Sequence, residues 1–591
     1  MERGINSKEN VLVVVAIDFG TTYSGWAYSF RKEYKENHTN IKTKGGWKNF
    51  DGQATEKTPT VALFTPEDKF HSFGYEAENK YAELVDEEQS TGWKYFKRFK
   101  MALLSDDTKQ FGHQQRKLVT GKISRHQKLK DVNGKKLPSL TVVSECLKFL
   151  KDDFLKALKE KVNFVEMKDI HWVITVPAIW SDEAKAFMRL AANQAGIDDT
   201  LLSLAYEPEA AAIYCRDIII QKKTDGEDYS MASLDPGEKF LVLDCGGGTV
   251  DITGYTIEEG NKLIELFPPT GGPWGGTEVD KQFQDLIVEI FGKEVWHMFE
   301  KSCMNDSLEL MRRFEGRKKV FGENDEDKVR IQCPGELFEQ YKSKTGLAFQ
   351  SELGVKKVRD KLVFPTQIMK DLFQKPLNAI IDNVRKLLTK PEMKGLKTIL
   401  MVGGFSESAL LYEGFRSIFP TLNVFRPHAA VLSVVKGAVI FGHTPEIITE
   451  RVCARTYGIA GNIPFDSQIH PQRCLGYYEG IAKCTDSFQT IVKKGAMISL
   501  EHNSFERTFL PTYGSDEEAS VDIYVSRDHN PLYTFGDGVK RLGSLVLKIP
   551  DTKKGKNRPI TVRISFKGTE IVVTAVEQGT RNIVSEKFNS I

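Results

Sequence analysis

One sequence pattern occurs twice in this chain of 591 residues and constrains its fold more than any other feature. Residues 13–30 read VVVAIDFGTTYSGWAYSF, where an apolar strand ends in Asp18 and a Gly-Thr-Thr turn leads into a second strand. Residues 241–255 read LVLDCGGGTVDITGY, where Asp244 precedes three glycines and a threonine. A strand interrupted by glycine predicts a tight hairpin, because glycine lets the backbone bend sharply. The repeat predicts two similar lobes with one hairpin each.

The two glycine turns suit a phosphate chain that is gripped from both sides. Successive backbone N–H groups in such a turn form a concavity that binds anions. An aspartate beside a phosphate repels it unless a divalent cation lies between them, so Asp244 and Asp251 of the second hairpin indicate Mg²⁺ held largely through water. A hairpin that binds no ligand is the alternative for either turn alone. A third turn, Gly403–Gly404, follows the strand TILMV, and three turns together favour a nucleotide.

Length and charge limit the classes of protein that fit this sequence. A chain of 591 residues is too long for one core, so we expect at least two domains. With 82 basic and 80 acidic residues the net charge is +2, which implies no attraction to nucleic acid or to an anionic membrane. The longest early apolar run, residues 11–17, is well short of the roughly 18 residues of a membrane span.

Cysteine usage indicates the compartment. The eight cysteines include no CxxC pair, and they are sparse for this length, which fits a reducing environment better than a disulfide scaffold. The N-terminus is polar and lacks the basic region and cleavage site of a signal peptide. We therefore expect a cytoplasmic protein, with the nucleus as a second candidate compartment.

The pattern of predicted elements changes once along the chain. Before about residue 450, buried strands such as residues 171–176 alternate with amphipathic helices such as residues 141–161, which predicts an α/β fold. Afterwards, short alternating segments separated by turns predict a β-sandwich; they are residues 520–525, 542–549, 560–566 and 570–576. We expect a two-lobed domain over residues 1–450 and a smaller β-sandwich domain over residues 451–591.

The three turns, in this order and spacing, resemble the nucleotide-binding domain of the seventy-kilodalton heat-shock protein (DnaK-like) family, in the actin and sugar-kinase superfamily. The segments VITVPAIWSD and YEPEAAAIY between the turns are particularly similar to that family. The resemblance covers roughly residues 12–445, and the β-sandwich resembles the substrate-binding domain of the family. Trp180, GGPWGGTEVD and GGFSESALL resemble the divergent heat-shock protein twelve branch. The resemblance implies an actin-like ATPase domain.

The resemblance also implies ligands and residue roles. It implies ATP or ADP with Mg²⁺, with K⁺ as a further candidate, and it makes Asp18 and Asp244 the residues that hold the hydrated metal. The residues expected around the phosphates are Gly20, Thr21, Thr22, Tyr23, Gly246, Gly247, Gly248 and Thr249. Those expected in catalysis, with water as nucleophile, are Lys97, Glu207, Asp244 and Thr249. Those expected around the ribose and adenine are Gly275, Gly276, Glu315, Lys318, Lys319, Gly403 and Gly404.

Three of these assignments have alternatives. Glu207 could be only an acidic residue at a helix N-terminus, where it complements the dipole. Lys97 lies in a lysine-rich run, so its alignment could shift by a position. Lys318 and Lys319 could be a solvated helix face.

The sequence also departs from the family. Glu407 stands where the family has an arginine that stacks on adenine, and a carboxylate cannot supply that cation–π contact. Lys185 replaces the arginine that partners the family's switch proline, here Pro177, and it lacks the planar fork. The leucine-rich acidic linker is replaced by TPEIITERVCARTYG, and we expect no helical lid. The coupling between the domains is therefore expected to differ.

These observations favour an ATP- and magnesium-binding, slowly hydrolysing, chaperone-like protein. Its nucleotide state would control a C-terminal β-sandwich that binds protein partners, with a co-chaperone or a nucleotide-exchange factor as further partners. The alternatives are a nucleotide-stabilised scaffold with little hydrolysis, a small-molecule (sugar-type) kinase on the same fold, and an actin-like filament former. The appended β-sandwich argues against the kinase.

Overall fold

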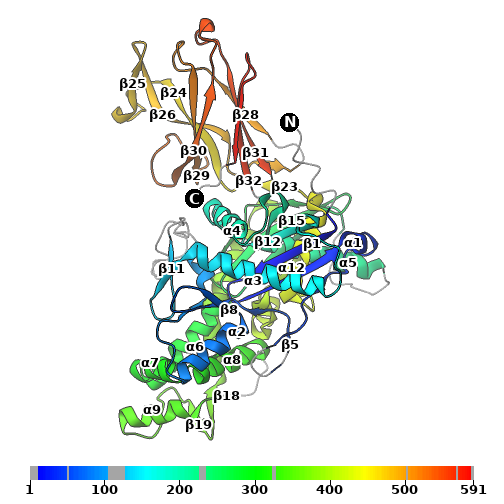
Figure 1. Ribbon diagram of the computed structural model, residues 1–591, viewed down its shortest axis with the longest axis vertical. Coiled ribbons are helices and arrows are strands. Elements are labelled where there is room, and N and C mark those ends of the chain that lie inside the picture. The colour runs from blue at the N-terminus through cyan, green and yellow to red at the C-terminus, as the bar shows by residue number, and fades with distance from the viewer. Residues whose placement is uncertain are drawn as a thin grey trace. The chain divides into compact units, whose positions relative to one another are not determined.

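The computed structural model describes residues 11–48, 52, 54–103, 127–224, 235–322, 328–500, 504–567 and 570–587 (Figure 1). The chain forms two compact units, the first made of Met1–Gly254 and Thr270–Pro445 and the second of Tyr255–Pro269 and Glu446–Ile591. Residues 255–269 therefore belong with the second unit, whereas the predicted division at residue 450 places them in the first domain. That residues 1–450 and 451–591 fold as independent domains stays a prediction.

The first unit contains one sheet built around the first glycine hairpin. Its strand order is β13-β12-β1-β2-β3, with β6 paired to β2: β13 (Leu202–Tyr206), β12 (Ile170–Val176), β1 (Val13–Phe19), β2 (Tyr23–Phe30), β3 (Lys42–Thr43) and β6 (Thr58–Pro59). β12 is parallel to β1, and every residue of both strands is buried, as expected for a sheet covered on both faces. Helices α3 (Ser139–Lys159) and α12 (Ser433–His443) both contact β1.

A second sheet of the first unit contains the second hairpin. Strand β14 (Lys239–Cys245) is parallel to β21 (Thr398–Val402), which is parallel in turn to β22 (Asn423–Phe425). After the glycine turn, β15 (Val250–Glu258) begins, and its first residues pair with β17 (Thr270–Gly272). Each of the two sheets thus holds one Asp-Gly-Thr hairpin, and the predicted α/β class is confirmed.

Local sequence signals place several helices that position the site. Ser181 caps α4 (Asp182–Gln194), and its hydroxyl accepts a hydrogen bond of 3.3 Å from the Ala184 N–H. Residues 278–320, which are helical in pattern, form three helices, because the helical backbone is interrupted at Gly292, with a φ of 90°, and again at Cys303. These helices are α6 (Gly276–Phe291), α7 (Lys293–Ser302) and α8 (Met304–Val320).

In the second unit, two sheets share one apolar core, which is the architecture of the predicted β-sandwich. One sheet has the order β25-β26-β24-β29-β30 and the other β28-β31-β32-β33. Their bounds are Leu475–Tyr478, Ile481–Val492, Thr456–Pro464, Glu518–Ser526, Val539–Lys548, Phe505–Phe509, Ile560–Lys567, Glu570–Glu577 and Ile583–Lys587. The inward residues include Ile523 and Leu547 from the first sheet and Val562 and Val573 from the second.

The second unit also includes paired strands to which the middle of the chain contributes. Strand β16 (Lys262–Glu265) pairs with the end of β15 and with β23 (Ile448–Val452), which pairs with β27 (Met497–Ser499). The strand β15 therefore begins in one unit and ends in the other. None of the helices in the described ranges combines the length and the apolar character needed to cross a bilayer.

Candidate functional site

A cleft of about 420 Å³ lies within the first unit, where the three predicted glycine turns meet. The turn residues that line it are Gly20, Thr21, Thr22, Tyr23, Gly246, Gly247, Gly248, Thr249, Gly403 and Gly404. A Cβ atom at Gly248 would lie 2.8 Å from the Thr21 hydroxyl oxygen, and one at Gly403 would lie 2.6 Å from Asp244 Oδ1. Since real Cβ atoms essentially never come so close to another atom, these glycines are what allow the turns to approach one another.

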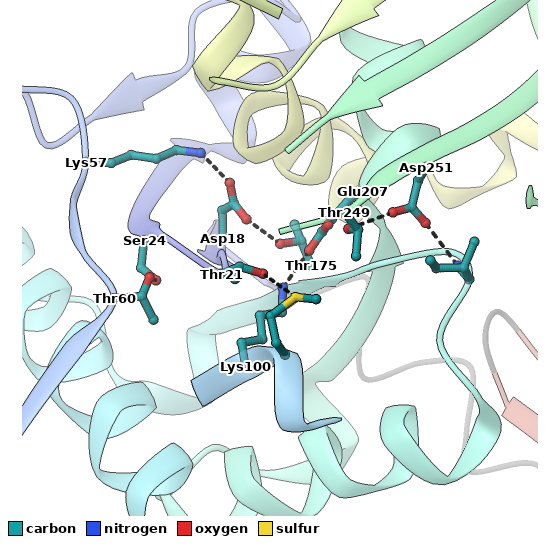
Figure 2. A network of polar contacts seen from close by, with 12 residues as sticks. Asp18, Thr21, Ser24, Lys57, Thr60, Lys100, Thr175, Glu207, Thr249 and Asp251 are labelled. Carbon is teal, nitrogen blue, oxygen red and sulfur yellow. Dashed lines mark hydrogen bonds and ion pairs between the residues drawn. The ribbon is translucent and has the colours of Figure 1, made fainter. Parts of the chain in front are cut away.

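Asp18 lies at the floor of the cleft with both carboxylate oxygens engaged (Figure 2). Its Oδ1 accepts a hydrogen bond of 2.8 Å from the Thr175 hydroxyl, and its Oδ2 accepts one from the Lys57 ammonium. Thr175 belongs to β12, whose residues pair with β1 in parallel register up to Ile17 and Ile174. The adjacent ends of two parallel strands therefore bring Asp18 and Thr175 together.

Two further carboxylates, those of Glu207 and Asp251, lie on the side of Asp18 opposite to Lys57 (Figure 2). Glu207, at the start of α5 (Glu207–Thr224), accepts a hydrogen bond of 2.8 Å from Lys100 Nζ. Asp251 accepts one of 3.1 Å from the Thr249 hydroxyl and one of 3.0 Å from the Ile179 N–H. Figure 2 shows these contacts on separate segments around one centre. The carboxylate of Asp251 therefore fixes the orientation of the threonine that ends the second glycine turn.

The carboxylates outnumber the cations in this part of the cleft. We call six largely buried groups the inner cluster: Asp18, Glu207, Asp244, Asp251, Lys57 and Lys100. Burial raises the pKa of Asp244 well above its ordinary value, and the charges of Glu207, Asp251 and Asp18 add to the effect. Burial, with the charge of Glu207, raises the pKa of Asp251 to about 7. Four carboxylates against two ammonium groups favour binding of a further cation.

The comparison with known proteins identifies the family. The family model described as Hsp70 protein matches residues 14–459. The chain is 32% identical to Heat shock 70 kDa protein 12B of Homo sapiens, over 97% of this chain and 90% of the relative. It is 32% identical to Heat shock 70 kDa protein 12A of Homo sapiens (99% and 92%) and 33% identical to that of Mus musculus (98% and 92%). The chain belongs to the Hsp70 family.

Membership of the Hsp70 family confirms the predicted fold and branch. The family has an actin-like ATPase domain, and the first unit contains the two sheets, each with one hairpin, that the sequence repeat predicts. The two named relatives belong to the predicted heat-shock protein twelve branch. The fold is therefore that of a nucleotide-binding ATPase.

The Hsp70 family generally binds ATP or ADP with Mg²⁺, and the inner cluster fits that cation. Asp18 and Asp244 both line the cleft. Within the described ranges, no group of three or more His, Cys, Asp or Glu residues lies close enough together to hold a metal directly. Mg²⁺ keeps several of its waters and takes one or two carboxylates, so contact through water suits this arrangement.

One predicted catalytic residue lies away from the cleft. Lys97 ends β9 (Lys94–Lys97) with an exposed side chain, and it is absent from the residues that line the cleft. Arg98 then adopts a φ of 54° and reverses the chain, so that Lys100 points inward and is only 2% exposed. Lys100 Nζ lies 2.8 Å from Glu207 Oε1 and 5.1 Å from the ring centre of Trp180. Lys100 therefore lines the cleft, whereas Lys97 is not among its lining residues.

Most of the residues predicted around the ribose and adenine line the cleft. Gly276, Glu315, Lys318, Lys319, Gly403 and Gly404 line the cleft, whereas Gly275 lies behind it and donates its N–H to the Gly248 carbonyl at 3.3 Å. Lys318 is buried and donates 2.6 Å to Asp280 Oδ1, so it does not belong to a solvated helix face. Lys319 is half exposed and lies 3.4 Å from Glu407 Oε2.

Other residues of the site had not been predicted. Lys57 and Asp280, which line the cleft, and Thr175, which contacts Asp18, were missed, although Thr175 stands in a segment that carries the resemblance. The position of Thr175 at the carboxyl end of a strand next to Asp18 is a signal that could have identified it. Lys185, expected to partner Pro177, donates to Tyr206 Oη at 3.0 Å and to Asp182 Oδ1 at 3.3 Å.

Proposed function

We propose that the protein binds ATP or ADP with Mg²⁺ in this cleft, hydrolyses ATP slowly, and uses its nucleotide state to control partner binding by the β-sandwich. The observation that carries the proposal is the meeting of three glycine turns around an inner cluster with more carboxylates than cations. Membership of the Hsp70 family supports a nucleotide over other phosphate ligands. K⁺ remains a further candidate for the excess negative charge.

The residues of the two glycine hairpins would bind the phosphates. Backbone N–H groups of Gly20 to Thr22 and Gly247 to Thr249 would donate to phosphate oxygens from opposite sides, because the Gly246 N–H already donates to the Thr249 carbonyl at 3.0 Å. The Thr249 hydroxyl is held by Asp251, which limits its rotation. Asp18 and Asp244 would hold the hydrated cation, which neutralises phosphate charge when it is bound.

Hydrolysis would depend mainly on positioning and charge. Lys100 lies in a nearly dry environment, where its ammonium would stabilise the negative charge on the transferring phosphoryl group more strongly than in water. Glu207 holds that ammonium at 2.8 Å, and it would also orient the attacking water. The catalytic set that we propose is therefore Lys100, Glu207, Asp244 and Thr249.

Recognition of the base would differ from that of an arginine-stacked site. Lys319 and Glu407 face each other at 3.4 Å, so the carboxylate engages a neighbouring lysine instead of offering a cation to the base. We expect the site to discriminate weakly between purine bases. Competition between ATP and GTP for binding measures this directly.

The β-sandwich would supply the partner-binding surface. Around strand β26, four large apolar side chains are more than half exposed: Ile469, Tyr477, Ile481 and Leu532. Hsp70 proteins generally bind protein clients, and exposed apolar side chains in a sheet-rich unit suit an extended peptide. A co-chaperone or an exchange factor would be a further partner. All eight cysteines are free thiols, which supports a reducing compartment such as the cytosol or the nucleus.

The test is calorimetry of ATP and ADP with Mg²⁺, combined with a phosphate-release assay on the same preparation. Tight binding with slow release, and a loss of release but not of ADP binding in Lys100→Met, is the expected result. Lys97→Met is the matched control, because this lysine lies three residues away outside the cleft. Binding without release would favour the nucleotide-stabilised scaffold, and sugar-dependent formation of ADP without release of inorganic phosphate would favour the kinase, which transfers the phosphoryl group to the sugar. No binding would contradict the proposal.

A further inference from the structure

Lys57 lies next to Asp18, where the sequence predicts a hydrated metal ion and no cationic side chain. Its ammonium forms an ion pair with Asp18, one of the two aspartates expected to hold hydrated Mg²⁺. The lysine is 9% exposed and Asp18 is 5% exposed, so the pair is shielded from bulk water. Lys57 also lines the cleft beside the glycine turns. The Lys57 ammonium is therefore a cation of the protein itself that lies beside Asp18, one of the two aspartates expected to hold the metal.

The backbone of the first hairpin leaves space for the Lys57 side chain to reach Asp18. Gly25 of β2 lies directly opposite Asp18 in the register of β1 and β2. The stem of Lys57 crosses this glycine, since a Cβ atom at Gly25 would lie 3.1 Å from Lys57 Cγ. The missing side chain at residue 25 therefore leaves a passage through which the lysine reaches Asp18.

The backbone of Lys57 is also fixed on both sides. The next residue, Thr58, pairs with Ser24 of β2. The Thr55 hydroxyl lies 2.9 Å from the Lys57 carbonyl and 3.0 Å from the Trp47 carbonyl, and its single proton is shared between these two acceptors. Since the chain is held before and after Lys57, its ammonium is a built part of the cleft and not a surface charge that happens to fold inward.

The ion pair changes what Asp18 requires from solution. With Thr175 on Oδ1 and Lys57 on Oδ2, both oxygens have donors before any ligand binds. Lys100 likewise forms an ion pair with Glu207. Within the described ranges, however, no lysine or arginine forms an ion pair with Asp244 or Asp251. The need for a mobile cation is therefore concentrated at the second hairpin.

We propose that Lys57 is a resident cation of the phosphate site, which competes with the divalent metal for Asp18 and contacts the nucleotide phosphates itself. It thereby makes binding of a nucleoside diphosphate only weakly dependent on Mg²⁺. The inference rests on the proposed function, because it concerns the same cleft. Its chemistry needs no additional group, since an ammonium donates directly to phosphate oxygens.

The experiment measures the dissociation constant of ADP by calorimetry for the full chain, once with excess Mg²⁺ and once with excess EDTA. The readout is the ratio of the EDTA value to the Mg²⁺ value, which a general loss of stability would not change. We expect a ratio below about tenfold for the natural protein and at least about tenfold higher in Lys57→Met, because a buried charge pair loses one partner. Lys57→Arg keeps the charge and should restore a low ratio.

Two further variants make the result decisive. Lys48→Met removes an exposed lysine from β4 (Trp47–Lys48) and should leave the ratio unchanged. If Lys57→Met does not fold, Gly25→Ala displaces the lysine without removing its charge, and it should raise the ratio by a smaller factor. Titration with Mg²⁺ alone should show tighter metal binding when Lys57 is removed.

The outcomes separate this inference from the proposed function. Equal ratios in the natural protein and in both Lys57→Met and Gly25→Ala would overturn the role of Lys57 while leaving nucleotide binding intact. A natural protein that binds ADP neither with Mg²⁺ nor with EDTA would overturn the proposed function, and the inference with it. A ratio that rises in Lys57→Met and falls again in Lys57→Arg would support the inference.

Discussion

The two glycine hairpins of the first unit are alike in sequence and opposite in electrostatics. Each has an aspartate at the end of its first strand, and each aspartate lines the same cleft. Although burial opposes it, the Lys57 ammonium lowers the pKa of Asp18 from its usual value. The pKa of Asp244 is raised well above its usual value by burial, with further increases from neighbouring carboxylates. Within the described part of the chain, Asp18 therefore has an ion-pair partner and Asp244 has none.

The difference shows that a repeated motif fixes backbone geometry but not charge. The hairpins themselves are set by their glycines and strands, which are local in sequence. The counter-charge of Asp18 comes from the segment between β5 (Ala54–Thr55) and β6, nearly forty residues along the chain. Among the described residues, no lysine or arginine forms an ion pair with Asp244, so its charged form depends on a cation from solution.

The largest expected change in the free energy of unfolding comes from breaking the ion pair of Asp18 and Lys57 at the first hairpin. Asp18→Asn would leave the Lys57 ammonium buried without its carboxylate, which typically costs about 3–5 kcal/mol of the free energy of unfolding. Denaturant unfolding followed by tryptophan fluorescence measures this, because all seven tryptophans lie between residues 26 and 296, within the first unit. The double variant Asp18→Asn with Lys57→Met should recover much of the loss. Unchanged stability in the single variant would mean that the pair is not buried as described.

The corresponding change in the second hairpin should have the opposite sign. Asp244→Asn removes a charge that its neighbours disfavour, so the nucleotide-free protein should unfold at a higher temperature. The same variant should release phosphate about a hundredfold more slowly, because it loses a charge at the reacting centre. Thermal unfolding and phosphate release on one preparation check both parts. A lower unfolding temperature would contradict the asymmetry between the hairpins.

A smaller effect, visible as a pH dependence, is expected at Asp251. With a pKa of about 7 in the folded protein and an ordinary value of 3.8, the folded state binds an extra proton between these pH values. Stability from this group is therefore present at low pH and lost as pH rises toward 7. The unfolding temperature of Asp251→Asn minus that of the natural protein should increase from pH 4 to pH 7 and then level off. A difference that is constant across this range would refute the raised pKa.

The smallest effect is expected at the mouth of the cleft. The pair of Lys319 and Glu407 is partly exposed, with side-chain exposures of 46% and 30%. Solvent screens such pairs, so Glu407→Ala should change the free energy of unfolding by less than about 1 kcal/mol. Denaturant unfolding beside Asp18→Asn measures the contrast between the two pairs. An equal loss in both variants would show that burial does not distinguish them.

Much of the fold could be predicted because its signals are local. The Asp-Gly-Thr repeat and the change in pattern near residue 450 are both visible in the sequence. The site was predicted less completely, because its cations depend on where the chain reverses. The turn at Arg98, with its φ of 54°, brings Lys100 and not Lys97 into the cleft, and the sequence YFKRFK contains no residue that predicts this turn.

Lys57 was missed for a related reason. It lies in a segment whose sequence is typical of a loop, and its role depends on Gly25 of another strand. Likewise, residues 255–269 join the second unit through pairing of β16 with β23, some 180 residues later. Contacts between such distant positions leave no periodic pattern in a single sequence.

The division of strand β15 between the units has a consequence for connectivity. The polypeptide passes from one unit to the other at Gly254, returns at Thr270 and passes again at Pro445. A single cut after Pro445 would therefore not separate the units, since the chain would still join them at both ends of residues 255–269. Truncation after residue 450 would remove β27 and the last two residues of β23, so that the remainder of β23 would lose its pairing with β27. In this protein the second unit is covalently tethered at three points, and its detachment requires cutting all of them.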